Sequence, residues 1–135
     1  MAQKTVILVV EDEAIIRMGA VQMLEDAGFT VVEAGNAHDA VSILEDRNDV
    51  CAIFTDINMP GTMDGMRLAR MVRGRWPPIH LIVTSGLAFP HDDDFPPGGK
   101  FIPKPYDPRH VIATLRELLG QIPPSYPILQ ARKAA

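Results

Sequence analysis

The chain has 135 residues, of which 47% are hydrophobic and 22% are charged, and its formal net charge is −4 at pH 7. These values fit a single globular domain and exclude a disordered or collagen-like chain. The negative charge argues against direct binding of nucleic acid, because a face that binds a duplex normally carries a basic stripe.

No segment has the pattern of a membrane span or a signal peptide. The first apolar run, residues 6–10, ends at the carboxylates of residues 11–13 and is too short for either. Cys51 is the only cysteine, so no intramolecular disulfide can form. We therefore expect a cytoplasmic protein without a membrane partner.

The chain opens with a strand and a helix. Residues 6–10 (VILVV) form a β-branched run without alternation, which is typical of a strand covered on both faces in a parallel sheet. A helical pattern starts at Glu13, and Gly28 is placed to end it. The expected inner face of this helix consists of Ala14, Ile15, Met18, Ala20, Val21, Met23 and Leu24.

A second and a third strand follow. Residues 29–33 predict one strand, and residues 51–55 predict another that ends at Asp56. Between them, Asn36 can cap a helix. The inner face of this helix should contain Ala40, Val41, Ile43 and Leu44.

The middle of the chain repeats this order. Residues 59–62 are turn material, and Asp64 precedes a helix whose expected inner positions include Leu68 and Val72. Residues 79–83 predict the fourth strand, which ends at the hydroxyl residues Thr84 and Ser85.

The segment of residues 88–100 is rich in proline and glycine, so we expect one turn or an irregular loop there and a fourth helix that is short or absent. Residues 101–103 predict a short fifth strand. Asp107 caps the last helix, Pro108 starts it, and Gly120 ends it.

Five alternating strands and helical segments predict an α/β domain, a five-stranded parallel sheet doubly wound by helices. We expect this domain to span residues 1–120. Residues 121–135 form a proline-containing tail that is too short for a second domain.

Chemically active residues recur where the strands end. Glu11 and Asp12 follow the first strand, Asp56 the third, Thr84 the fourth and Lys104 the fifth. In a parallel sheet these ends lie on one rim. Carboxylates gathered there repel one another unless a cation neutralises them, and Mg2+ prefers such oxygen ligands. A hydroxyl and an ammonium facing them suit the oxygens of a phosphoryl group.

The motifs at these positions resemble the receiver domain of two-component response regulators. They are VVEDE at residues 9–13, DINMP at 56–60, MDG at 63–65, VTSG at 83–86 and KP at 104–105. The resemblance covers residues 5 to 120. It implies a flavodoxin-like fold with strand order 2-1-3-4-5, as in a chemotaxis regulator of this family.

The resemblance also implies a role for each site residue. Asp56 would accept a phosphoryl group, with Mg2+ (or Mn2+) held by Asp12, Asp56 and the backbone carbonyl of Asn58, and indirectly by Glu11. Thr84, Ser85 and Lys104 would bind the phosphoryl group. Phe101 matches the switch aromatic of the family, although core packing is its alternative role, and the peptide bond before Pro105 would be cis.

The implied donor is a sensor histidine kinase or a histidine phosphotransfer protein. Phosphorylation would change a surface that a partner protein reads, and the catalysis would be limited to self-phosphorylation and slow self-dephosphorylation. Since no output region follows Gly120, we expect the signal to pass to a separate protein. The chain is either a stand-alone receiver or part of a hybrid kinase.

Two segments depart from the usual receiver pattern. Gly61 and Thr62 make the loop after Pro60 one residue longer than its commonest form. The proline-rich and aspartate-rich residues 89–99 replace the regular fourth helix that many receivers use to form dimers, so we do not transfer that dimer geometry.

Two other functions remain open at this point. A haloacid-dehalogenase-like phosphatase also forms an aspartyl phosphate, but it needs an aspartate where this chain has Asn58. A pseudo-receiver would work as a docking module without phosphorylation. His91 with Asp92, Asp93 and Asp94 indicates a solvated loop rather than a second metal site.

Overall fold

The computed structural model describes residues 5–57, 65–86 and 96–121, which contain a five-stranded parallel sheet in the order β2-β1-β3-β4-β5. The predicted fold class and strand order are confirmed. Each strand lies within two residues of its predicted position. The strands are β1 (Val6–Val10), β2 (Thr30–Ala34), β3 (Val50–Asp56), β4 (His80–Ser85) and β5 (Lys100–Pro103).

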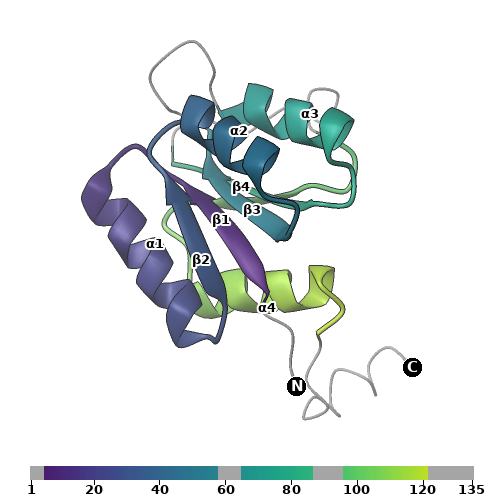
Figure 1. Ribbon diagram of the computed structural model, residues 1–135. Helices are drawn as coiled ribbons and strands as arrows, with labels where there is room; N and C mark the ends of the chain where they lie inside the picture. Colours follow the sequence, from purple (N-terminus) through teal and green to yellow (C-terminus); the bar gives the residue numbers. More distant parts are fainter. Residues whose placement is uncertain (1–4, 58–64, 87–95, 122–135) are drawn as a thin grey trace.

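Helices cover both faces of the sheet (Figure 1). The part of the chain that the structure describes contains α1 (Ala14–Asp26), α2 (Ala37–Asp46), α3 (Gly65–Arg75) and α4 (Pro108–Leu118). One hydrophobic core packs α1 and α4 against one face, and a second packs α2 and α3 against the other. None of these helices is long and apolar enough to span a membrane.

The unbroken apolar run of β1 serves both cores. Val6, Leu8 and Val10 face α2 and α3, whereas Ile7 and Val9 face α1 and α4. All five are buried because the strand is central in the sheet and successive side chains point to opposite faces.

The predicted caps define the helix ends. The side chain of Asn36 accepts a hydrogen bond from the backbone N–H of Asp39 at 2.7 Å, and Asp107 accepts one from the N–H of Arg109 at 2.9 Å. Gly28, with φ of 98°, follows α1, and Gly120, with φ of 70°, follows α4. Both glycines adopt the left-handed conformation that commonly ends a helix.

The predicted inner face of α1 is partly wrong. The helix buries Ala20 and Leu24, whereas Ile15 is 84% exposed and Met18 is 65% exposed. At 3.6 residues per turn, positions 15 and 18 lie on the side of the helix opposite Ala20. The prediction assigned too many residues to the buried face, because this helix carries apolar side chains on both its buried and its exposed sides.

Two predicted segments fall wholly or partly outside the described residues. The lengthened loop with Asn58 lies wholly outside them, in residues 58–64. The proline-rich segment of residues 88–100 lies partly outside them, because residues 87–95, which include the aspartate cluster, are not described. Between β4 and β5, the described residues 96–99 form a turn in which Gly98 has φ of 79° and contain no helix.

Candidate functional site

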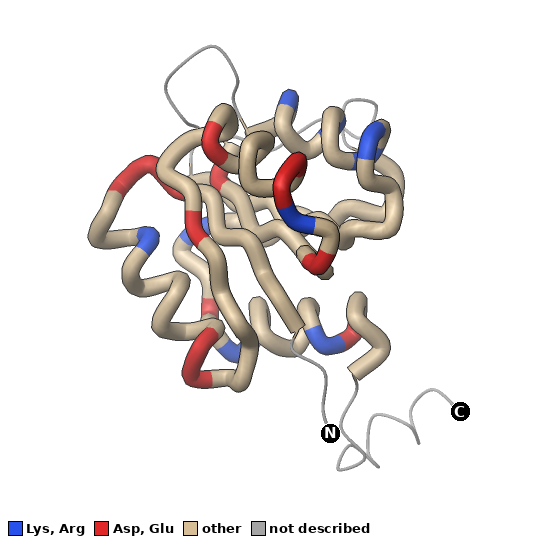
Figure 2. Tube along the Cα trace, in the orientation of Figure 1, with Lys and Arg blue, Asp and Glu red and all other residues tan. Residues whose placement is uncertain are grey.

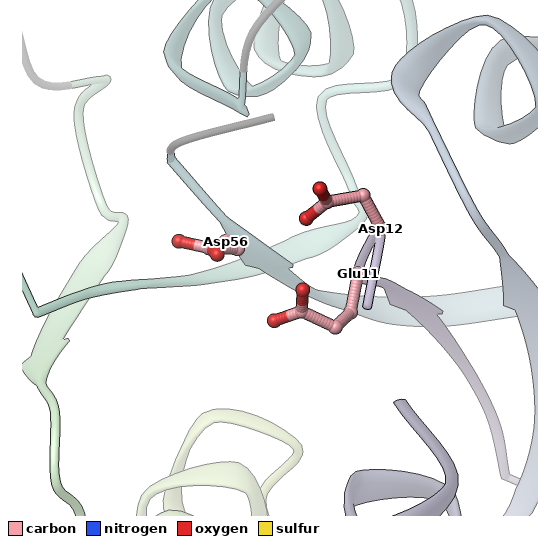
Figure 3. A group of neighbouring side chains, drawn as sticks. All are labelled: Glu11, Asp12 and Asp56. Atoms are coloured by element: carbon pink, nitrogen blue, oxygen red, sulfur yellow. The ribbon is translucent and has the colours of Figure 1, made fainter. Parts of the chain in front are cut away.

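Three carboxylates meet at the carboxyl ends of β1 and β3 (Figure 3). Glu11 and Asp12 follow β1, and Asp56 is the last residue of β3. One oxygen from each carboxylate lies within 4.8 Å of the other two. Because β1 and β3 pair in parallel, with Val10 opposite Thr55, the two strands deliver their acidic residues to the same rim.

Lys104 brings a positive charge to this group. Its Nζ lies 3.2 Å from Oδ2 of Asp56 and 3.3 Å from Oε1 of Glu11. The backbone N–H of Lys104 donates to the carbonyl of Ser85 at 3.0 Å, which fixes the start of this segment against β4. The Lys104–Pro105 peptide bond is cis.

The mutual effect of these charges appears in two pKa values. Burial raises the pKa of Glu11, and Asp12 and Asp56 raise it further, although the N–H of Glu13 and the ammonium of Lys104 oppose the change. Burial alone would lower the pKa of Lys104, but Asp56 and Glu11 raise it above its usual value. The site therefore keeps its ammonium charged and favours additional positive charge beside Glu11.

Thr84 places a hydroxyl beside Asp56. The two residues are register partners across β3 and β4, and both are buried. The Oγ1 of Thr84 has no hydrogen-bond partner among the described residues. A buried hydroxyl without a partner is costly, so this atom is available for an acceptor that enters the site. Ser85, the next residue, is also buried.

A small cavity of about 10 Å3 is lined in part by this cluster. Its polar lining includes Glu11, Asp56, Thr84 and Lys104, which the sequence singled out, and Tyr106, which it did not. The Tyr106 ring meets Phe54 edge-on at 5.5 Å between ring centroids, and burial raises the pKa of its hydroxyl. Tyr106 lies two residues after Lys104 in the sequence, and this proximity could have indicated that it belongs to the site.

The other predicted site residues are placed as follows. Phe101 on β5 is half-buried and packs against the core beneath α2 and α3, so this conformation shows the core-packing role, and its switch role stays a prediction. Asn58 lies outside the described residues. The sequence also missed Arg17, whose Nη1 donates to the carbonyl of Glu11 at 2.8 Å.

The donor set at the rim consists of oxygen atoms, and one of its carboxyl groups has a raised pKa. Hard divalent cations bind oxygen ligands, and Mg2+ usually takes one or two carboxylates. This acidic group therefore fits a metal ion of that class.

Comparisons with known proteins agree with this geometry. The family model of the response regulator receiver domain matches residues 7–116. Sensor kinase CckA of Brucella abortus (strain 2308) is 38% identical over 120 residues, which cover 84% of this chain and 12% of that protein. Transcriptional regulatory protein ResD of Bacillus subtilis (strain 168) is 35% identical over 119 residues, which cover 86% of this chain and 48% of the regulator.

A solved structure has the same fold. The crystal structure of a response regulator receiver protein from Sinorhizobium medicae WSM419 matches with a TM-score of 0.82 and 27% identity, covering 87% of this chain and 96% of that chain. This chain therefore corresponds to nearly the whole of a solved receiver but spans less than half of CckA and of ResD.

Proposed function

Because this chain belongs to the family of response regulator receiver domains, we propose that Asp56 accepts a phosphoryl group and thereby switches a protein-interaction surface. One observation carries the proposal: the buried carboxylate of Asp56 lies beside those of Glu11 and Asp12, with one oxygen of each within 4.8 Å of the others, and 3.2 Å from the ammonium of Lys104. The domain is proposed to span residues 1–120, followed by a tail of residues 121–135.

The proposed donor is a phosphohistidine of a sensor histidine kinase or a histidine phosphotransfer protein. A carboxylate oxygen of Asp56 forms a bond to phosphorus while the bond from phosphorus to the imidazole nitrogen breaks, and the electron pair stays on that nitrogen. The product is an acyl phosphate on Asp56. Lys104 and Thr84 are proposed to donate hydrogen bonds to the phosphoryl oxygens, and Ser85 is proposed to assist them.

Asp12 and Asp56 are proposed to hold Mg2+, or Mn2+ in its place, with the backbone carbonyl of Asn58 as a further ligand and Glu11 as an indirect one. When bound, this ion supplies positive charge against the developing charge of the phosphoryl oxygens. The negative charges of the carboxylates and the positive charge of the Lys104 ammonium then partly cancel around the transferred group.

Phosphorylation replaces the single negative charge of the Asp56 carboxylate with about two on the phosphoryl group, and it brings three strong acceptor oxygens to the rim. The hydroxyl of Thr84 gains a partner, and we propose that Phe101 changes its packing in response. A separate partner protein in the cytoplasm then reads the altered surface. The chain is proposed to act on no external substrate, and its chemistry is limited to gain and slow loss of its own phosphoryl group.

The test is incubation with Mg2+ and a small acyl-phosphate donor, followed by intact-protein mass spectrometry. The wild type is expected to gain one phosphoryl mass, whereas Asp56→Asn and a sample with excess chelator gain none. Failure of the wild type to gain this mass would refute the proposal.

Two measurements separate the other candidate functions. Multiple turnover of a phosphomonoester that is abolished in Asp56→Asn would indicate a phosphatase. Equal affinity of a partner for the wild type, Asp56→Asn and the phosphorylated protein would indicate a docking module that works without phosphorylation.

A further inference from the structure

Arg17 ties the segment after β1 to strand β2. From α1, its Nη1 donates to the backbone carbonyl of Glu11 at 2.8 Å, and its Nε donates to Oε1 of Glu33 at 2.9 Å. The side chain is 22% exposed, so most of it is covered by the protein.

We propose that Arg17 is a positioning residue for the divalent-cation site, an inference that rests on the proposed function. It holds the peptide unit that joins Glu11 to Asp12 and thereby orients the carboxylate of Asp12 toward that of Asp56. At the site its guanidinium contacts the backbone carbonyl of Glu11, whereas Lys104 contacts the carboxylates of Glu11 and Asp56.

The planarity of the peptide bond links this contact to the metal ligand. The carbonyl oxygen of Glu11 and the Cα of Asp12 belong to one rigid plane, so a donor that fixes the oxygen also fixes the base of the Asp12 side chain. On the other side, the N–H of Glu11 donates to the carbonyl of Ala34 at 3.1 Å. The backbone N–H of Glu11 is thus bonded directly to β2, and its carbonyl is linked to β2 through Arg17 and Glu33.

Two further residues keep Arg17 in this position. Glu33, half exposed on β2, accepts from its Nε and lies opposite Val9 in the sheet. A Cβ on Gly35 would lie 3.3 Å from Nη1, a tight contact, so the glycine leaves room for the guanidinium. The guanidinium therefore bridges the segment after β1 and strand β2 in one defined geometry.

The sign of the expected effect distinguishes positioning from electrostatics. Removing a positive charge near three carboxylates strengthens cation binding by Coulomb attraction alone. Loss of a group that orients a metal ligand weakens binding, typically by about 10- to 100-fold. Weaker binding in Arg17→Ala therefore reports lost geometry.

The experiment is a titration of the full chain with Mg2+ alone. Binding is measured by calorimetry and by the NMR chemical shifts of the amides of residues 11–13. Arg17→Ala is expected to bind Mg2+ roughly tenfold more weakly than the wild type. Arg17→Lys, which keeps one contact, and Glu33→Gln should lie between them. Arg47→Ala is the matched control, because Arg47 also pairs with a carboxylate, that of Asp49, but at the opposite end of the sheet.

The outcomes are distinct. If the wild type binds Mg2+ and Arg17→Ala, Arg17→Lys and Glu33→Gln bind it equally well or more tightly, this inference is overturned and the proposed function stands. If neither the wild type nor Asp12→Asn shows any Mg2+ response, the proposed function fails as well. Should Arg17→Ala not fold, Arg17→Lys and Glu33→Gln carry the same test.

Discussion

The Nζ of Lys104 lies 3.2 Å from Oδ2 of Asp56, so a cation supplied by the chain contacts the proposed phosphoacceptor. The two residues come from opposite sides of β4, Asp56 from the end of β3 and Lys104 from the segment after β5. This ammonium both neutralises the carboxylates and competes with any other cation for them.

Replacement of Lys104 should therefore separate metal binding from phosphorylation. We expect Lys104→Ala to bind Mg2+ several-fold more tightly, because a competing positive charge is gone. Phosphorylation should nevertheless change the protein-interaction surface of this variant less than that of the wild type. Unfolding free energy should fall by no more than about 1 kcal/mol, as for a partly exposed ion pair. Lys100→Ala, which removes an exposed lysine of β5, is the control. A large drop in melting temperature or weaker Mg2+ binding would contradict this prediction.

The raised pKa of Glu11 predicts how stability without divalent ions depends on pH. Because this pKa is higher in the folded state than its usual value of 4.5, the carboxyl group contributes stability that is full below pH 4.5 and is lost as the pH rises through the folded pKa. Glu11→Gln should abolish this loss and raise the melting temperature at pH 7 in a chelator. The check is a series of thermal melts between pH 4 and pH 8 for both proteins, and parallel curves would refute it.

Gly65 allows α3 to start directly against the site. A Cβ at this position would overlap the backbone carbonyl oxygen of Asp56 and would lie 2.8 Å from the Cα of Ile57. We expect Gly65→Ala to destabilise the protein by about 1–3 kcal/mol, since backbone atoms must move. Gly74→Ala, in the same helix with open space around it, should be stabilising by about 0.5–1 kcal/mol. Urea unfolding of both variants tests the contrast, and equal effects would contradict it.

The buried hydroxyl of Thr84 has no hydrogen-bond partner in the described part of the chain, and this costs stability until an acceptor enters the site. We expect Thr84→Val to stabilise the unphosphorylated protein by about 1 kcal/mol, because a hydroxyl without a partner among residues 5–57, 65–86 and 96–121 is replaced by a methyl group of similar shape. The same variant should respond less to phosphorylation. Thr55→Val is the matched control, because the equally buried Oγ1 of Thr55 donates to the carbonyl of Asp56 at 3.0 Å, and its loss should be destabilising. Chemical denaturation decides the sign for each.

Much of the fold was predictable because local signals agreed with the long-range structure. The β-branched run of β1 indicated a central strand, and Asn36 and Asp107 marked helix starts that the structure shows as side-chain caps. The rule that parallel strands end on one rim placed Glu11, Asp12 and Asp56 together, and the structure brings their oxygens within reach of one cation.

The missed features depend on contacts that no local pattern encodes. Ile15 and Met18 fit an apolar helix pattern, yet only the direction in which α1 faces the sheet decides that they are exposed. The role of Arg17 depends on the carbonyl of Glu11 and on Glu33 of the neighbouring strand, and nothing in the spacing of these residues indicates that they meet.

The position of β5 at the edge of the sheet has a consequence for the order in which the site opens. β1 and β3 are central strands bonded on both sides, whereas β5 has four residues and pairs with β4 alone among the strands of the described sheet. Short edge elements detach in partial unfolding before central ones do. Fraying of β5 would therefore withdraw Lys104 and leave the acidic residues of the rim assembled, and amide exchange should be fast at Ile102 while it remains slow at Leu8 and Ile53.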